Sequence, residues 1–182
     1  MATNQRIERY LARFTGKKTF EELTTPLAIA ATDINAGVTV YYSGGPLGPP
    51  LRGSCAYPGL FVPIHYEDRI LVDGFLTAPV PVEGAALLGA DVVIAVFLEP
   101  GAAAYPRTAA DVISRSFTII QRHTDLAWRQ QADVIIEPDV KPFLWDDFTR
   151  THQLVGVGAA AATAALPKIR ELLGLANQEP AA

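Results

Sequence analysis

Asp73 is the strongest candidate for chemistry in this sequence, because it follows the strand-like run 69–72 and precedes Gly74. α/β folds place functional side chains at strand ends, and the glycine permits a tight turn there. A carboxylate at such a point can act as a general base toward a neighbouring hydroxyl. The alternative is that Asp-Gly forms only a turn, with the aspartate bonding the backbone two residues further on. Taken alone, the dipeptide favours the turn.

Cys55 is the second candidate, as a nucleophile partnered by one of three histidines, at positions 65, 123 and 152. A single cysteine flanked by small residues is more often a small buried hydrophobic side chain than a nucleophile. The sequence favours that structural interpretation.

Metal and cofactor sites are not predicted. The acids Asp125, Asp146 and Asp147 do not combine with His123 or His152 at a known ligand spacing. The glycines of the segment 156–158 lie in an Ala-rich stretch that predicts a helix, not a phosphate-binding loop. The two tryptophans, Trp128 and Trp145, are expected to serve packing.

The composition predicts a soluble globular protein with one domain over residues 1–182. Hydrophobic residues make up 49% of the 182 residues and charged residues 19%, with 15 basic against 19 acidic side chains. Without a basic cluster, nucleic acid is not expected as a partner. One cysteine cannot form an internal disulfide, which favours a reducing, cytoplasmic location. No stretch reaches the roughly 20 apolar residues of a membrane span.

The hydrophobic pattern predicts an α/β fold. A helix over 7–14 precedes a hairpin formed by 27–31 and 38–42. A strand at 69–72, a helix at 81–88 and a buried strand at 92–97 predict a right-handed βαβ unit. Further on we expect a long helix, a short buried strand and a kinked tail helix, over residues 109–131, 134–136 and 146–173. Within the tail, the apolar run 154–166 is expected to be buried.

The predicted strands are few, and several read as buried on both faces. A small sheet leaves its outer strands exposed, which is unfavourable for long apolar strands. We therefore expect this chain to be part of a larger sheet.

Segments 26–37, 45–63, 71–96 and 132–148 resemble, in order and spacing, those of bacterial patatin-like phospholipases. The first contains PLAIAATDINAG, the second LRGSCAYPGLFVP, and the third LVDG followed by PVPV and LGADVVIAV. The resemblance extends over about residues 19 to 174. It implies a three-layer α/β/α fold, of which this chain is the C-terminal portion.

The resemblance also implies hydrolysis of lipid acyl esters, of phospholipase A or lysophospholipase type, by a Ser–Asp dyad without a cofactor. The match assigns Asp73 as the catalytic aspartate and places Gly74 and Phe75 at the substrate. The family's serine stands in a GxSxG elbow upstream of every matched segment. Neither Ser43 nor Ser54 has the elbow's glycine spacing. The chain alone is therefore predicted to be inactive.

Two departures from the family pattern leave an alternative open. Phe75 replaces a small residue after the Asp-Gly pair, and Ala78 stands where asparagine is common. The alternative is a non-catalytic pseudoenzyme or interaction subunit that completes its sheet with a partner chain. The partners considered are a lipid or acyl-ester substrate, the missing N-terminal segment or another chain, a peripheral membrane contact, and a second copy of this chain.

Overall fold

The computed structural model describes residues 5–16, 18–99, 105–106, 108–124, 126–143 and 148–175. The chain divides into two compact units, Met1–Ala90 and Asp91–Ala182, and each is described by itself. Together they contain helices and two sheets, so the predicted α/β class is confirmed. The single domain, the three-layer arrangement and the incomplete sheet stay predictions.

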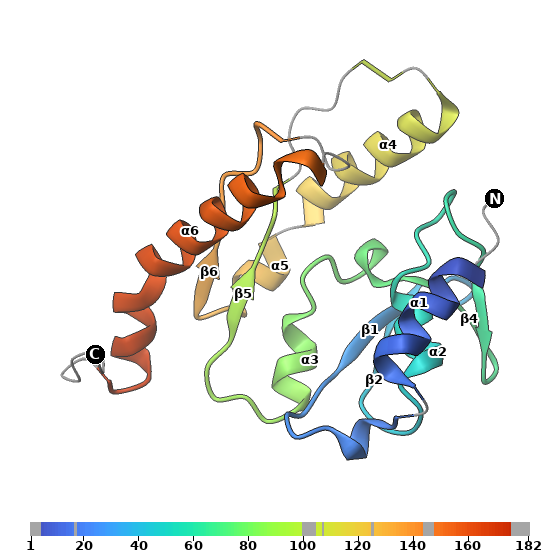
Figure 1. The fold of residues 1–182 in the computed structure, drawn as a ribbon, viewed down its shortest axis with the longest axis horizontal. Coiled ribbons are helices and arrows are strands. Elements are labelled where there is room, and N and C mark those ends of the chain that lie inside the picture. The colour runs from blue at the N-terminus through green and yellow to red at the C-terminus, as the bar shows by residue number, and fades with distance from the viewer. Residues whose placement is uncertain are drawn as a thin grey trace. The chain divides into compact units, whose positions relative to one another are not determined.

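The first unit contains a four-stranded antiparallel sheet in the order β2-β1-β4-β3 (Figure 1). The predicted hairpin is confirmed: Ile29 pairs with Tyr42 and Asp33 with Val38, and Gly37 in the turn has a positive φ of 69°. Such a φ suits glycine, which has no Cβ to clash with the backbone. The four strands are β1 Ile29–Asp33, β2 Val38–Tyr42, β3 Ile64–Tyr66 and β4 Arg69–Asp73.

Both faces of the central strand β1 are covered, and every residue of it is buried. On one face lies α2 (Gly48–Ser54), where a Cβ at Gly53 would stand 2.9 Å from the Cβ of Leu71. On the other lie η2 (Gly74–Leu76) and α3 (Val82–Leu87), and α3 brings Gly84 against Tyr41. Glycine at these contacts lets helix and sheet backbones approach closely.

The α2 face carries the hydrophobic core of this unit. Its centre is fully buried, with Ala31 and Leu71 at 0% exposure. The chain enters through α1 (Gln5–Thr15), as predicted, and η1 (Phe20–Glu22), where the backbone N–H of Thr19 donates to Glu22 Oε2 at 2.8 Å. The core cluster consists of Phe20, Ile29, Ala31, Tyr42, Leu47, Ala56, Ile64 and Leu71.

The second unit contains a two-stranded parallel sheet, in which Ile94 pairs with Val134 and Val96 with Ile136. Trp128 is buried, and its ring centroid lies 5.3 Å from that of Phe97, as expected for packing. The elements are β5 Ile94–Val96, α4 Ala109–Thr124, α5 Leu126–Arg129, β6 Val134–Ile136, η3 Phe148–Arg150 and α6 Thr151–Leu172.

The predicted βαβ unit is wrong. The helix over 81–88 is present as α3, but β4 pairs antiparallel with β1 and β3, whereas β5 pairs with β6 in the other sheet. Hydrophobic runs do not specify which strands pair, so the pattern could not distinguish these topologies. The run 92–97 was also expected to be buried, yet Val96 is 58% exposed and only Ala95 of β5 is buried.

Two predicted helices differ from the observed ones. Of the long helix predicted over 109–131, the structure describes α4 and the short α5, and Asp125 between them lies outside the described residues. The tail helix α6 begins at Thr151 and contains Pro167, but none of its residues is buried, and Val155 is 66% exposed. The expectation that the run 154–166 is buried is therefore wrong. Its small residues favour a helix but offer little side-chain area to bury.

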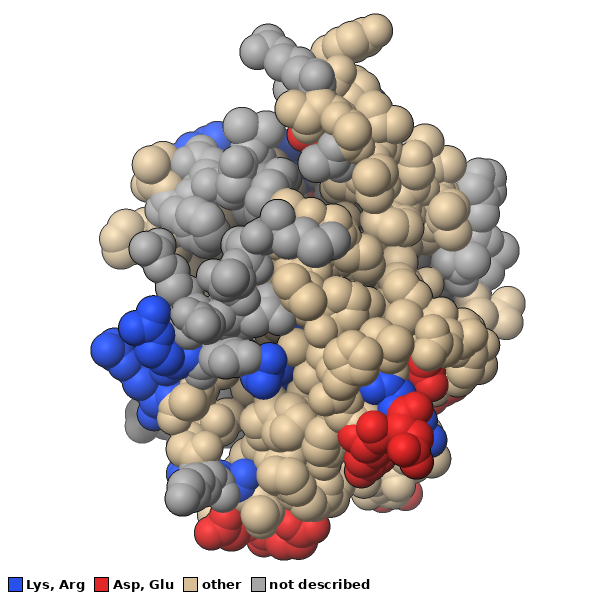
Figure 2. All heavy atoms as spheres, turned by 90° about the vertical axis from the view of Figure 1, so that its right-hand side faces the viewer, with Lys and Arg blue, Asp and Glu red and all other residues tan. Residues whose placement is uncertain are grey.

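The described surface carries charges of both signs. On the face shown in Figure 2, the described Lys and Arg side chains form separate groups, with acidic groups and uncharged surface between them. In the part of the chain that the structure describes, no helix has both the length and the apolar character to cross a membrane.

Candidate functional site

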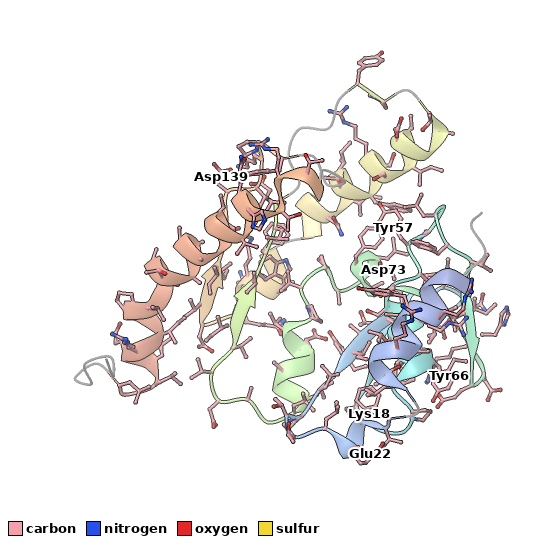
Figure 3. All side chains as sticks on the ribbon, in the orientation of Figure 1. Lys18, Glu22, Tyr57, Tyr66, Asp73 and Asp139 are labelled. Carbon is pink, nitrogen blue, oxygen red and sulfur yellow. The ribbon has the colours of Figure 1, made fainter. Side chains whose placement is uncertain are left out.

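Asp73 lies entirely within the first unit, as the last residue of β4 and the N-cap of the short helix η2 (Figure 3). The expectation that it comes just past the strand is wrong, since it still pairs with Ala31 of β1. Side chains alternate along a strand, so Asp73 and Leu71 share the face covered by α2. The carboxyl group is therefore at the end of the sheet and beside the loop that follows α2.

The backbone of Asp73 is held on both sides. Its N–H donates to the carbonyl of the buried Ala56 at 3.0 Å, which ties β4 to the loop after α2. Its carbonyl accepts a 3.0 Å hydrogen bond from the hydroxyl of Thr32 on β1. These two contacts fix the position of the strand end from which the carboxyl group projects.

Three threonine hydroxyl groups join the end of β4 to β1 and β2. Thr32 Oγ1 lies 2.9 Å from Thr77 Oγ1, and Thr39 Oγ1 donates to Thr77 Oγ1 at 2.8 Å. Thr77 ends η2, so the cluster holds both ends of the turn that carries Asp73. Sequence reasoning missed this cluster, because nothing local in the sequence brings positions 32, 39 and 77 together.

Gly74 is buried where η2 crosses β1. A Cβ at this position would lie 2.7 Å from the carbonyl oxygen of Ala30 and 3.0 Å from its carbonyl carbon. Gly74 is not among the glycines with positive φ, so this close approach, not the turn conformation, requires glycine. The structure places Gly74 against the sheet, and its predicted role in substrate binding stays a prediction.

The Asp73 carboxyl group is half-buried, and one of its two oxygens accepts a hydrogen bond. The backbone N–H of Phe75 donates to Oδ1 at 3.0 Å, which is the contact that the turn interpretation predicts. Burial raises the pKa of Asp73 by disfavouring the charged form, and the hydrogen bond from Phe75 partly opposes this rise. A carboxylate with a raised pKa is a better proton acceptor, so the turn and the general base are compatible.

Phe75 contacts this carboxyl group through its backbone N–H, and the residue is half-buried. Its ring stacks on that of Tyr57, with centroids 4.7 Å apart and planes at 9°. Tyr57 comes from the loop after α2, so the stack joins that loop to η2. The predicted place of Phe75 at the substrate stays a prediction.

The Cys55 thiol lies near Asp73, at the C-terminal end of α2. Burial raises the pKa of Cys55, and the negative charge of Asp73 raises it further. Both effects disfavour the thiolate, which is the nucleophilic form. The structure therefore supports the interpretation of Cys55 as a partly buried small side chain.

The other candidates lie on different elements, and the side chain of His123 in α4 is outside the described residues. His65 lies on β3, and His152 is exposed in the first turn of α6. Within the described ranges, no group of three or more His, Cys, Asp or Glu side chains could hold a metal ion. Gly156 and Gly158 lie inside α6, as predicted. Four of the residues considered, Asp125, Trp145, Asp146 and Asp147, are outside the described residues.

The chain is similar to uncharacterized NTE family proteins of mycobacteria. It is 35% identical over 105 residues to NTE family protein Rv1063c of Mycobacterium tuberculosis, covering 55% of this chain and 29% of the relative. It is 26% identical over 190 residues to NTE family protein Rv2565 of the same organism, covering 88% of this chain and 32% of the relative. No family model matches the chain. The chain thus spans about a third of the length of these curated relatives.

Proposed function

We propose that this chain carries the aspartate of a Ser–Asp dyad in a lipid acyl-ester hydrolase of the patatin-like class. The observation that carries the proposal is the Asp73 carboxyl group, half-buried at the end of β4 with its backbone held on both sides. The similarity to NTE family proteins supports it, because NTE denotes neuropathy target esterase, which has a patatin-like phospholipase domain.

In the proposed reaction, Asp73 accepts the hydroxyl proton of a serine as that oxygen attacks the carbonyl carbon of a lipid ester. The protonated Asp73 then gives this proton to the alkoxide that leaves, which forms the acyl-enzyme and restores the carboxylate. The carboxylate next takes a proton from the water that attacks the acyl carbon and returns it to the serine oxygen as the fatty acid leaves. The serine would come from a GxSxG segment outside these 182 residues, in the same or another polypeptide. Because Phe75 occupies Oδ1, Oδ2 is the oxygen proposed to receive the proton.

The raised pKa of Asp73 supports the role of base. A carboxylate of ordinary pKa is a weak acceptor for a hydroxyl proton, and burial brings the pKa nearer to a useful value. No histidine is needed between the two residues if the serine hydroxyl docks directly on Oδ2.

Activity of the native polypeptide or assembly that contains this chain tests the proposal. We expect a fluorophosphonate probe to label a serine there, and Asp73→Asn to lower turnover of a short acyl ester at least about 100-fold, as for loss of a general base. Asp68→Asn is the matched control, because Asp68 is an exposed acid in the turn before β4. Full activity of the Asp73→Asn protein would refute the assignment.

The 182-residue chain by itself is expected to show neither labelling nor turnover. If the chain alone turns over ester and Asp73→Asn abolishes this activity, the nucleophile lies within these residues and our account of the serine is wrong.

A non-catalytic interaction subunit is the second candidate. The aromatic stack of Phe75 on Tyr57 favours it, because a bulky ring held by a second ring stands where the family resemblance leads us to expect a small residue. Under this alternative, the native assembly binds no fluorophosphonate, and Asp73→Asn changes only the stability of the chain.

A further inference from the structure

The first helix of the chain, α1, carries basic residues along one side. Arg6, Arg9 and Arg13 recur at intervals of three and four residues, so they lie on one face of the helix. We call these three residues the basic stripe. The side chains of Arg9 and Arg13 are exposed, whereas Leu11, on the far side of the helix, is half-buried. The helix therefore presents positive charge to solvent.

Positive charge is concentrated in this part of the chain. Residues 5–18 contain five basic side chains and one acidic one, so the other residues carry ten basic and 18 acidic side chains. The absence of a basic cluster, expected from the composition, therefore does not extend to this segment. The two acids that follow, Glu21 and Glu22, accept backbone N–H groups of Gly45 and Thr19. An anionic surface attracts the segment 5–18 and repels the rest of the chain, which turns α1 toward that surface.

Tyr10 adds an aromatic ring to this face. It lies one turn after Arg6, between the basic stripe and the apolar side of the helix, and is 61% exposed. A tyrosine is favoured at a membrane surface, where its ring meets the acyl boundary and its hydroxyl group meets water. Helices with a basic face and an aromatic residue beside it lie in the plane of such a surface.

The basic stripe and the Asp73 carboxyl group are on the same side of the sheet. α1 packs against α2, and α2 covers the sheet face that Leu71 and Asp73 share (Figure 1). All of these residues belong to the first unit. A membrane that binds α1 therefore meets this unit on the side that holds the candidate base.

We propose that α1 is a membrane-docking element, which binds an anionic phospholipid surface through the basic stripe and Tyr10. The choice of a membrane over another polyanion rests on the proposed function, because the proposed substrate is a lipid ester. In this arrangement the helix lies parallel to the surface with its arginines at the headgroups. Each arginine near an anionic surface increases the affinity about fivefold.

Co-sedimentation of the 182-residue chain with vesicles tests this inference without any need for turnover. We expect the chain to bind vesicles of equal parts phosphatidylglycerol and phosphatidylcholine at least about tenfold more tightly than vesicles of phosphatidylcholine alone. Raising the ionic strength from about 0.05 to about 0.5 M should remove most of this difference, because salt screens charges at the surface.

Charge removal on α1 is the decisive comparison. Arg9→Gln combined with Arg13→Gln is expected to weaken binding to the mixed vesicles at least about tenfold. Arg115→Gln combined with Lys168→Gln removes the same charge from exposed positions of the second unit and should leave the affinity unchanged. Tyr10→Ser should weaken binding at least about twofold without changing its salt dependence.

An affinity of the α1 double variant equal to that of the wild-type chain would overturn the inference, as would an equal loss in the control variant or full affinity of Tyr10→Ser. Binding of the wild-type chain to duplex DNA as tightly as to the mixed vesicles, at the same phosphate concentration, would also overturn it, because the stripe would then be a nucleic-acid site. Circular dichroism checks that each variant is folded. If the double variant is not folded, Arg13→Gln alone replaces it, with an expected loss of about fivefold.

Failure of the inference is distinguishable from failure of the proposed function. Absence of serine labelling or ester turnover in the native assembly would refute the proposed function and leave the vesicle results unchanged. Vesicle binding that does not depend on α1 would refute the docking element and leave the assignment of Asp73 unchanged.

Discussion

The hydroxyl group of Thr32 on β1 donates a 3.0 Å hydrogen bond to the backbone carbonyl of Asp73 at the end of β4. Thr32 is 2% exposed, so the bond forms away from water, where an unmet acceptor is costly. The contact joins two residues 41 positions apart and holds the strand end that presents the candidate catalytic carboxylate.

Thr32→Val should destabilise the sheet of the first unit by about 1–2 kcal/mol, since valine has the same shape but leaves the Asp73 carbonyl without this donor. Hydrogen exchange of the β1 and β4 amides measures the effect locally. Thr39→Val is the control, because Thr39 is more exposed and, in the described contacts, its hydroxyl bonds the Thr77 hydroxyl and not the Asp73 carbonyl. Equal losses for the two variants would contradict the special role of Thr32.

Gly74→Ala should lower the free energy of unfolding by about 1–3 kcal/mol, as expected for overpacking of a rigid contact. The added Cβ would meet the Ala30 carbonyl oxygen at 2.7 Å, and neither backbone can move without breaking the pairing of β1 with β4. Urea denaturation followed by circular dichroism measures the loss. Gly48→Ala is the control and should have little effect, because a Cβ at Gly48 meets no atom within 4 Å. If the Gly74→Ala chain is as stable as the Gly48→Ala chain, the close approach of Gly74 to Ala30 is contradicted.

Asp73→Asn should raise the thermal stability of the chain at neutral pH. Burial raises the folded-state pKa of Asp73, so the folded state binds the proton more tightly than the unfolded state. The stability linked to this group is fully present below the unfolded pKa and is lost as the pH rises through the folded pKa. Asparagine is never charged and still offers an oxygen to Phe75.

The measurement is the melting temperature of both proteins as a function of pH. The gain in melting temperature from Asp73→Asn should be small at pH values below the ordinary pKa of an aspartate. It should grow with pH and reach a plateau above the raised pKa of Asp73 in the folded chain. A gain that is the same at every pH would mean that ionisation of Asp73 carries no cost in the folded chain.

Asp73→Asn should also speed alkylation of Cys55 by iodoacetamide at neutral pH. The charge of Asp73 contributes to the raised pKa of the thiol, so its removal increases the fraction of reactive thiolate. Burial, the larger cause, remains, and the rate should therefore stay below that of a small exposed thiol. Asp68→Asn should not change the alkylation rate. If Asp68→Asn speeds alkylation as much as Asp73→Asn does, the effect is not specific to the carboxylate next to the thiol.

Local pattern predicted most of the first unit. The hairpin of β1 and β2, the strand β4 and the helix α3 all follow from hydrophobic runs bounded by Gly and Pro, which act over a few residues. Strand pairing did not follow, because β4 and β5 have similar apolar character but belong to different sheets. Pairing depends on contacts between residues far apart in the sequence, which a local pattern does not contain.

For the candidate site, too, local features could be predicted from the sequence and contacts between distant segments could not. The sequence alone pointed to Asp73, because an Asp-Gly pair after a strand is a local signal, and the family resemblance added Gly74 and Phe75. The roles of the three residues stay predictions. The sequence also predicted the bond between the aspartate and the N–H two residues on, which is a property of the turn.

Only the tertiary structure showed why the glycine is needed and what holds the strand end that carries the carboxylate. The approach of Gly74 to Ala30, the hydroxyl bond from Thr32 and the stack of Tyr57 on Phe75 all join segments that meet through sheet pairing and helix packing. The sequence determined which groups are present and their local conformation. The fold decided their burial, and hence the pKa of Asp73, because desolvation depends on neighbours brought together in space.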